Sequence, residues 1–456
     1  MVFDDPPMRA TPPTEPGTDA VRPRIVPRSE HNISRANISE NALKVLYRLH
    51  KAGFAAHLVG GCVRDLLLGR QPKDFDVVTD AHPEQIKRLF SNCRLIGRRF
   101  RLAHVVFGRN VVEVATFRGS AADAEGDEHL RRADGMILRD NVYGTIDEDV
   151  WRRDFTVNAL YYDIADFSLI DYVGGLDDLR AGLIRPIGEP ERRYREDPVR
   201  MLRAVRFAAK LDFRIVPEAA EPILRLGHLL REVPPARLFD EVVKLFHGGA
   251  ALAALRGLIE FDLLRHLFPL AAAALEGGRY AFARPLFEAV AASTDARIAA
   301  DKSVTPAFLY AAFLWPALLE AAGYEGGEAP YPSGGELQKV AGAVIARQTG
   351  ATAVPRRFVA VVREIWSLQP RLQRNVNTRR ALALLEHPRF RAAYDLLCLR
   401  AAAGEPVQAE ADWWTELQAL PPERRLEKLA EAPARKRRRR RVRKRARRAR
   451  SGADGA

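Results

Sequence analysis

The sequence lacks long hydrophobic runs and is poor in cysteine. No stretch of about 18 apolar residues occurs, so no segment is predicted to span a membrane. Residues 1–30 are rich in proline, have no apolar signal-peptide core and are predicted to form a disordered leader. The three cysteines include no C-x-x-C pair, which argues against a disulfide framework and a zinc site and favours a reducing cytoplasm.

Residues 435–450 contain no acidic side chain and hold 13 of the 72 lysines and arginines. The formal net charge of +14 belongs to this segment, because the rest of the chain has 59 basic against 58 acidic residues. Arginine-rich flexible segments bind phosphate backbones without reading sequence, chiefly through counterion release. We therefore expect a near-neutral folded body and a basic, disordered tail over residues 421–456; a solubilising appendage is the alternative for the tail.

Hydrophobic periodicity predicts an α+β fold, with a mixed sheet in an N-terminal domain, all-α domains after it and disordered termini. Residues 31–150 read as alternating strands and helices, beginning with a helix capped by Ser39 and ending in a surface loop over residues 120–150. Residues 151–215 form a connecting region. Leucine- and alanine-rich segments over 216–420 predict helices only.

Residues 71–80, QPKDFDVVTD, are predicted to form a strand with Asp74 and Asp76 on one face and Phe75 and Val77 on the other. Like charges this close raise each other's pKa unless a cation lies between them. Two Mg²⁺ ions roughly 3.5–4 Å apart would relieve the repulsion and activate an attacking oxygen. An exposed edge strand with solvated acids is the alternative.

A Gly-Gly turn precedes the two carboxylates. In LVGGCVRD, Gly60 and Gly61 follow a predicted strand and open a predicted helix, where backbone N–H groups can approach phosphate. Arg64, one turn into the helix, can pair with phosphate bidentately. A loop closure is the alternative for the glycines alone, but together with D-x-D they predict a phosphate cradle that faces a metal site.

Four motifs resemble those of the class II nucleotidyltransferases of the polymerase-β superfamily: LVGGCVRDLLLG, KDFDVVTDA, RRDFTVNALYYD and REDPVRMLRAVRFAAKL. That family comprises the tRNA CCA-adding enzymes and the bacterial poly(A) polymerases. The resemblance covers roughly residues 30–270. It implies a catalytic head over 31–150, a base-reading neck over 151–215 and a helical RNA-binding body over 216–420.

The resemblance also implies roles for individual residues. Asp74 and Asp76 become ligands of two Mg²⁺ ions, which Mn²⁺ can replace, and ATP becomes the substrate. The implied triphosphate contacts are Gly60, Gly61 and Arg64. Glu113 and Asp154 are expected within the catalytic site, with their separate roles open and an exposed strand acid as the alternative for Glu113. The remaining implied nucleotide contacts are Arg153, Asn158, Asp197, Arg200, Arg203 and Arg206.

The predicted neck helix carries an arginine at every third position. Pro198 suits a first helical turn, which makes Asp197 a candidate N-cap. Its three arginines lie on one side, and Leu202, Val205 and Leu211 on the other; a solvated charged face is the alternative. In the family, the E-D-x-x-R element reads the base: the aspartate accepts from an exocyclic amine and the arginine donates to a ring nitrogen. Adenine and cytosine both offer such a pair, so Asp197 with Arg200 fits either base.

Two features favour a poly(A) polymerase over a CCA-adding enzyme. Residues 95–105, LIGRRFRLAHV, resemble a segment of bacterial poly(A) polymerases, and the basic tail suits an enzyme that accepts many RNA 3′ ends. We therefore expect template-independent AMP addition to mRNA and other transcripts, promoting RNA turnover in the cytoplasm, with RNA-decay proteins as partners. The alternatives are tRNA CCA addition and a non-catalytic RNA-binding protein. Adjacent Trp413 and Trp414 are predicted to anchor packing rather than to stack on bases.

Overall fold

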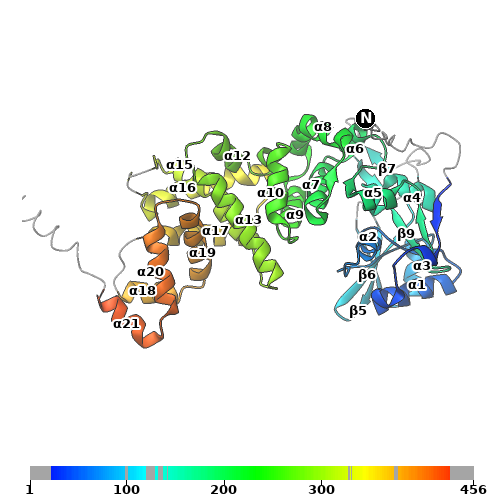
Figure 1. Cartoon of the computed structure of the whole chain (residues 1–456), viewed down its shortest axis with the longest axis horizontal. Helices are drawn as coiled ribbons and strands as arrows, with labels where there is room; N and C mark the ends of the chain where they lie inside the picture. The colour runs from blue at the N-terminus through cyan, green and yellow to red at the C-terminus, as the bar shows by residue number, and fades with distance from the viewer. Residues whose placement is uncertain are drawn as a thin grey trace, which may run out of the picture. The chain divides into compact units, whose positions relative to one another are not determined.

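The computed structural model describes residues 22–97, 101–119, 129–131, 137–140, 142–326, 329, 331–373 and 378–431. The chain divides into two compact units, the first ending at Leu267 and the second beginning at Phe268. Figure 1 labels their elements along the chain. Over the described ranges, no helix is both long enough and apolar enough to cross a membrane.

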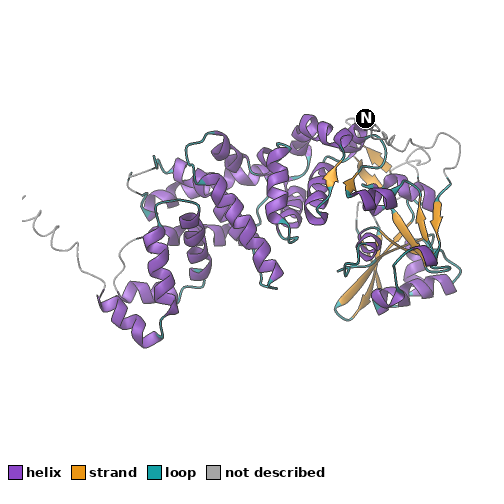
Figure 2. Cartoon of the chain, in the orientation of Figure 1, coloured by secondary structure: helices purple, strands orange, loops and turns teal. Residues whose placement is uncertain are grey.

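An eight-stranded mixed sheet forms the centre of the head in the first unit, in the order β1-β10-β9-β2-β3-β6-β5-β4 (Figure 2). Its strands are β1 (Arg24–Val26), β2 (Ala56–Val59), β3 (Asp76–Thr79), β4 (Cys93–Ile96), β5 (Leu102–Phe107), β6 (Asn110–Thr116), β9 (Leu160–Asp163) and β10 (Leu169–Asp171). Within this sheet β3 and β6 run parallel, and the other neighbouring pairs are antiparallel.

Four helices pack around this sheet: α1 (Glu40–Lys51), α2 (Gly61–Leu67), α3 (Pro83–Leu89) and α4 (Ile146–Arg152). The predicted cap of α1 is confirmed, because the Ser39 hydroxyl accepts a hydrogen bond from the Ala42 amide at 3.2 Å. The buried side chains of α1 recur at helical spacing and include Val45 and Leu49. This apolar stripe explains why α1 packs against β2 and β3.

The rest of the first unit is mainly helical. Its elements are α5 (Gly175–Ala181), α6 (Pro190–Glu196), α7 (Val199–Leu211), α8 (Pro217–Leu226), α9 (Pro235–Phe246), α10 (Ala251–Glu260) and α11 (Leu264–Leu267). Short 3₁₀ turns occur at η1 (Arg28–Glu30), η2 (Arg35–Asn37), η4 (Thr156–Asn158) and η5 (Gly227–Glu232). Strands β11 (Leu183–Ile184) and β12 (Arg214–Ile215) form a small parallel pair.

The structure differs from the predicted boundaries in four places. Residues 24–26 of the predicted leader form β1, which pairs with β10. The predicted loop 120–150 contains β7 (His129–Arg131), β8 (Ile137–Asp140) and most of α4. Strands β9 and β10 extend the head sheet beyond residue 150 into the predicted neck, and α21 lies within the predicted tail. Three- and four-residue strands are too short to show an alternating pattern in the sequence.

The second unit consists of helices. They are α12 (Pro269–Glu276), α13 (Ala283–Ala299), α14 (Pro306–Phe313), α15 (Trp315–Ala321), α16 (Gly334–Ala351), α17 (Arg356–Leu372), α18 (Thr378–Leu385), α19 (Phe390–Ala402), α20 (Gln408–Ala419) and α21 (Pro422–Glu431). The predicted α+β fold with a helical body is therefore confirmed. The predicted disordered termini fall mainly on residues 1–21 and 432–456, outside the described ranges.

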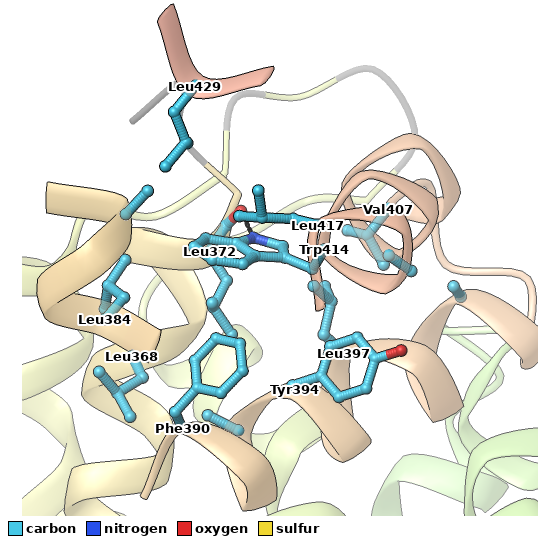
Figure 3. Close-up of a cluster of buried hydrophobic side chains, with 14 residues drawn as sticks. Leu368, Leu372, Leu384, Phe390, Tyr394, Leu397, Val407, Trp414, Leu417 and Leu429 are labelled. Atoms are coloured by element: carbon cyan, nitrogen blue, oxygen red, sulfur yellow. Dashed lines mark hydrogen bonds between the residues drawn. The ribbon is translucent and has the colours of Figure 1, made fainter. Parts of the chain in front are cut away.

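Trp414 lies at the centre of a hydrophobic core in the second unit (Figure 3). It is fully buried beside Phe390, and its indole Nε1 donates to the Leu372 carbonyl at 2.9 Å. Trp413 is partly buried and packs against the same cluster. The prediction that the tryptophan pair anchors packing is therefore confirmed.

Candidate active site

Three carboxylates, those of Asp74, Asp76 and Glu113, lie along the start of β3 and the neighbouring strand β6. Strand β3 starts at Asp76, so Asp74 lies just before the strand rather than on it as predicted. The predicted alternation still holds, because both aspartates are exposed and Phe75 between them is buried. Asp76 is the register partner of Glu113 across the parallel pair, and register partners point to the same face of a sheet.

The carboxyl group of Asp76 has a raised pKa. Neighbouring protein atoms partly desolvate the Asp76 carboxylate, and this raises its pKa to about 6. The negative charge of Glu113 and, to a smaller extent, that of Asp74 also raise the pKa, whereas nearby Arg153 lowers it. The residue is nevertheless exposed, so its carboxylate is accessible from solvent. The Nε2 atom of His104 lies 3.3 Å from a carboxylate oxygen of Glu113.

The donor set fits a divalent cation. Mg²⁺ is usually bound by one or two carboxylates together with water and substrate phosphates, and a cation would remove the repulsion around Asp76. Among the described residues, no three His, Cys, Asp or Glu side chains are already gathered into a metal-binding cluster.

The Gly-Gly turn leads from β2 into α2. Gly60 has φ +76°, in the left-handed region that favours glycine. A Cβ atom added there would lie 3.7 Å from the Asn158 carbonyl oxygen and 3.8 Å from Nη1 of Arg153. Gly61 begins the helix, and its own added Cβ would lie 3.5 Å from Nη2 of Arg64. The turn therefore brings backbone close to Arg153 and Asn158, two of the predicted nucleotide contacts.

Arg64 is buried, with 2% of its surface exposed, and its predicted contact with phosphate stays a prediction. Its Nη1 donates to Oδ1 of Asn158 at 2.6 Å. Its Nε and Nη2 donate to Asp65 at 2.9 and 2.7 Å. A bidentate contact with phosphate would require Arg64 to give up some of these hydrogen bonds.

Asp154 connects the head to the neck helix α7. One of its oxygens accepts from the Phe155 amide at 2.9 Å and from Nδ2 of Asn158 at 3.1 Å. The other accepts from Nε of Arg203 at 2.7 Å and also pairs with its Nη2. Burial would raise the pKa of Asp154, but Arg203 and these hydrogen bonds lower it to about 2. Asp154 is thus an ionised link between elements.

The arginine stripe of α7 is not a solvated face. Arg200 is buried and donates to Glu196 at 3.0 Å and to the Arg193 carbonyl at 2.8 Å. The guanidinium carbons of Arg203 and Arg206 lie 5.2 and 4.7 Å from the centre of the Phe207 ring. Among the described residues the buried Nε of Arg206 has no hydrogen-bond partner. Burial and then neighbouring Arg203 lower the pKa of Arg206, so a nearby anion would stabilise its charged form.

Asp197 is not the N-cap of the neck helix. Helix α7 begins at Val199 after Pro198, and Asp197 instead follows α6. Its carboxylate accepts two hydrogen bonds from Arg237 of α9, at 2.8 and 2.7 Å. Pro198 occupies the cap position, but Oδ1 of Asp197 still accepts a long hydrogen bond from the Val199 amide at 3.4 Å, and Arg237 balances its charge.

Comparison with known proteins identifies this arrangement. Three family models match: "Poly A polymerase head domain" over residues 56–185, "Probable RNA and SrmB- binding site of polymerase A" over 212–275 and "Polymerase A arginine-rich C-terminus" over 327–449. The chain is 53% identical to poly(A) polymerase I of Salmonella typhi over 424 residues, covering 91% of this chain and 90% of that protein. The chain belongs to the poly(A) polymerase family. It is therefore a template-independent nucleotidyltransferase that polyadenylates RNA.

CCA-adding enzymes are more distant from this family member. The CCA-adding enzyme of Lactobacillus helveticus is 37% identical over 222 residues, which cover 49% of this chain and 53% of that protein. In solved structures, the Bacillus stearothermophilus CCA-adding enzyme in complex with CTP matches with a TM-score of 0.57 and 26% identity, covering 82% of this chain and 80% of that chain. The prediction of a poly(A) polymerase of the class II nucleotidyltransferase family is confirmed.

Several residues that form hydrogen bonds with the predicted site residues or with their partners were not predicted from the sequence. They are Asp149, Tyr161, Arg193, Glu196 and Arg237. Glu196 stands within the quoted E-D-x-x-R element and could have been chosen. Arg237 lies 40 residues from its partner, and no local pattern signals such a contact.

Proposed function

We propose that this poly(A) polymerase transfers AMP from ATP to RNA 3′ ends at the site formed by Asp74, Asp76 and Glu113. In this reaction the RNA 3′-hydroxyl oxygen forms a bond to the α-phosphorus of ATP, and the bond from that phosphorus to pyrophosphate breaks. The observation that carries the proposal is the pairing of Asp76 with Glu113 on adjacent parallel strands, with Asp74 just before β3, beside a glycine turn. This combination supports nucleotidyl transfer.

Asp74 and Asp76 would hold two divalent ions, with Glu113 as a third acidic neighbour. Bound Mg²⁺ supplies charge that lowers the pKa of an attacking hydroxyl and neutralises a departing pyrophosphate. The raised pKa of Asp76 supports this assignment, because a bound cation would favour the ionised carboxylate against both burial, the larger cause, and the Glu113 charge.

The nucleotide would lie between the glycine turn and α7. Backbone N–H groups at Gly60 and Gly61 would face the phosphates, and Nη1 of Arg153 lies near this turn. Arg203 and Arg206 would add positive charge, while Asp197 and Arg200 would read the base. Figure 1 labels α2, β6, α4 and α7, which carry several of these groups within the first unit.

Some predicted contacts act indirectly in this proposal. Arg64, Asn158 and Asp154 form a hydrogen-bonded chain that ends on Arg203. We assign them the task of holding the glycine turn and the neck helix in register. A contact between Arg64 and phosphate would need rearrangement on nucleotide binding.

The basic segment 435–450 would bind the phosphate backbone of RNA outside the catalytic site. This supports use of many RNA 3′ ends, in mRNA and other transcripts, rather than one tRNA shape. We also propose that this polymerase promotes RNA turnover in the cytoplasm, alongside RNA-decay proteins.

The test is incorporation from an equimolar mixture of four nucleotides onto generic RNA and onto tRNA lacking its 3′ end. The proposal predicts long A tracts on both, lost in Asp74→Ala and Asp76→Ala while RNA binding is retained. Asp80→Ala, directly after β3, is the matched control and should stay active. A halted C-C-A product, or normal turnover by either site variant, would overturn the assignment.

A further inference from the structure

We propose that Asp149 and Tyr161 are positioning residues that aim Arg153 at the phosphate-binding turn. The inference rests on the proposed function, because it assigns a task to residues that act through a predicted nucleotide contact. Neither residue needs to touch the substrate. Both lie beneath the site, Asp149 on α4 and Tyr161 on β9.

Asp149 and Tyr161 occupy one edge of the Arg153 guanidinium. Nε of Arg153 donates to Oδ2 of Asp149 at 3.0 Å and to the Tyr161 hydroxyl oxygen at 2.8 Å. Nη2 donates to the same carboxylate oxygen at 2.7 Å. The Tyr161 hydroxyl in turn donates to Oδ2 of Asp149 at 2.8 Å. The three side chains form a closed triangle, which fixes the plane of the guanidinium.

The opposite edge of the guanidinium remains available. Among the described residues, Nη1 of Arg153 has no hydrogen-bond partner, and it lies 3.8 Å from where a Cβ on Gly60 would be. The charge of Arg153 also reaches Asp76, whose pKa it lowers against stronger opposing effects. Because a guanidinium is planar with donors on fixed edges, occupying one edge determines where the other points.

The triangle is built rigidly into the fold. Asp149 is 4% exposed and Tyr161 is fully buried. The second oxygen of Asp149 accepts from the Arg118 amide at 3.2 Å, beyond the end of β6. The main chain is held as well, since Nη2 of Arg193 donates to the Arg153 carbonyl at 2.6 Å.

The charges also require the triangle to stay intact. Burial would raise the pKa of Asp149, but Arg153, Arg118 and the Tyr161 hydroxyl lower it, so the carboxylate stays ionised. The ionised Asp149 carboxylate holds the long Arg153 side chain in one conformation. Without this contact, Arg153 would lose rotamer freedom when it binds phosphate. Because Arg153 is already ordered in the folded protein, ATP binding does not have to offset this loss of entropy.

The experiment compares Asp149→Asn, Tyr161→Phe and Arg153→Ala as full-length proteins. Each is assayed for kcat and the KM for ATP on generic RNA, and for binding of a non-hydrolysable ATP analogue without RNA. We expect Tyr161→Phe and Asp149→Asn to raise KM and weaken analogue binding about fivefold to fiftyfold, with a smaller change in kcat. Asp147→Asn, on the exposed side of the same helix and bonded to Tyr172, is the matched control and should change neither.

A double-mutant cycle separates positioning from general stability. If Asp149 acts through Arg153, adding Asp149→Asn to Arg153→Ala will cause no further loss in kcat/KM. Independent, multiplying losses would overturn the inference, as would unchanged ATP binding in Tyr161→Phe. If Asp149→Asn does not fold, Tyr161→Phe carries the same cycle. If Arg153→Ala alone leaves ATP kinetics unchanged, the proposed nucleotide role of Arg153 fails first.

Discussion

Two of the predicted nucleotide-binding arginines are buried and donate to identified acceptors. Arg64 donates to Asp65 and Asn158, and Arg200 donates to Glu196. Leaving such a group buried without a partner costs several kcal/mol, and the carboxylates and the amide oxygen that accept from Arg64 and Arg200 avoid that cost. These two arginines are therefore fixed by the fold rather than free at the surface.

Replacing Arg237 with alanine should relax nucleotide choice. In the structure, Asp197 is held by two hydrogen bonds from Arg237, which fix the position of an acceptor proposed to read the base. Without Arg237, Asp197 can turn to accept from the amine of cytosine as well as that of adenine. We expect the ATP-to-CTP ratio of kcat/KM to fall by about tenfold, the equivalent of about 1.4 kcal/mol.

The control for this variant is Arg225→Ala, which removes a more exposed arginine that pairs with Glu191. It should leave nucleotide choice unchanged. Preference for ATP that stayed intact in Arg237→Ala would show that Asp197 does not need its partner for discrimination.

His266 should make folding stability fall as the pH drops below neutrality. Burial and then Arg231 lower the pKa of His266 to about 4, and among the described residues its Nδ1 has no hydrogen-bond partner. The unfolded chain therefore binds a proton between about pH 6.5 and pH 4 that the folded protein does not bind. The stability linked to this group is present above pH 6.5 and is lost as pH falls toward 4.

Between pH 7 and pH 5 this group alone should reduce the free energy of unfolding by about 2 kcal/mol. Urea denaturation of the parent chain and of His266→Phe at both pH values measures the difference. The variant should lose less stability on acidification. Identical losses in both proteins would show that His266 titrates normally.

Among the helices and strands, segments with clear hydrophobic periodicity were predicted well from the sequence. Short strands and contacts between distant parts of the chain were predicted poorly. The capped helix α1 and the helical second unit both followed from spacing and capping chemistry. Edge strand β1 was not predicted because a strand of three residues is too short to show an alternating hydrophobic pattern. Contacts such as Asp197 with Arg237 join different elements, and only tertiary packing determines them.

The same contrast applies to the candidate site. The D-x-D pair, the glycine turn and the arginine stripe were found from the sequence because each is a local pattern. Their surroundings were not predicted: Arg64 is buried, and Asp154 faces Arg203. Burial depends on which elements pack together, and a single sequence carries no direct record of that.

Trp414 is expected to stabilise the packing of α20 against the other helices of the second unit. It is fully buried and hydrogen-bonded to the Leu372 carbonyl, so Trp414→Ala should cost about 3–5 kcal/mol of stability through the cavity that it leaves. Thermal denaturation followed by circular dichroism measures this loss. Trp413→Ala, at a partly buried neighbour, should cost less. Weaker RNA binding with unchanged stability would instead indicate that Trp414 stacks on bases.

For the whole molecule, charge is divided between a near-neutral body and the basic segment 435–450. A chain ending at Glu431 should still add AMP at low salt, but its affinity for RNA should be lower and less dependent on salt. Each phosphate contact with single-stranded RNA contributes roughly 0.7 to the slope of log affinity against log salt, so the slope should shrink by several units. Filter binding over a salt series measures it.

The control for truncation is a full-length chain whose tail lysines and arginines are replaced by glutamine. This variant keeps the length and removes the charge, so it should behave like the truncated chain. If it bound RNA like the parent, the tail would act through something other than its charge.

The central claim is that Asp74 and Asp76 share divalent cations with ATP. The most direct measurement is anomalous diffraction from a crystal grown with Mn²⁺ and α,β-methylene ATP. We predict manganese signal between the two aspartates and the triphosphate. An ordered nucleotide with no manganese at these carboxylates would contradict the account.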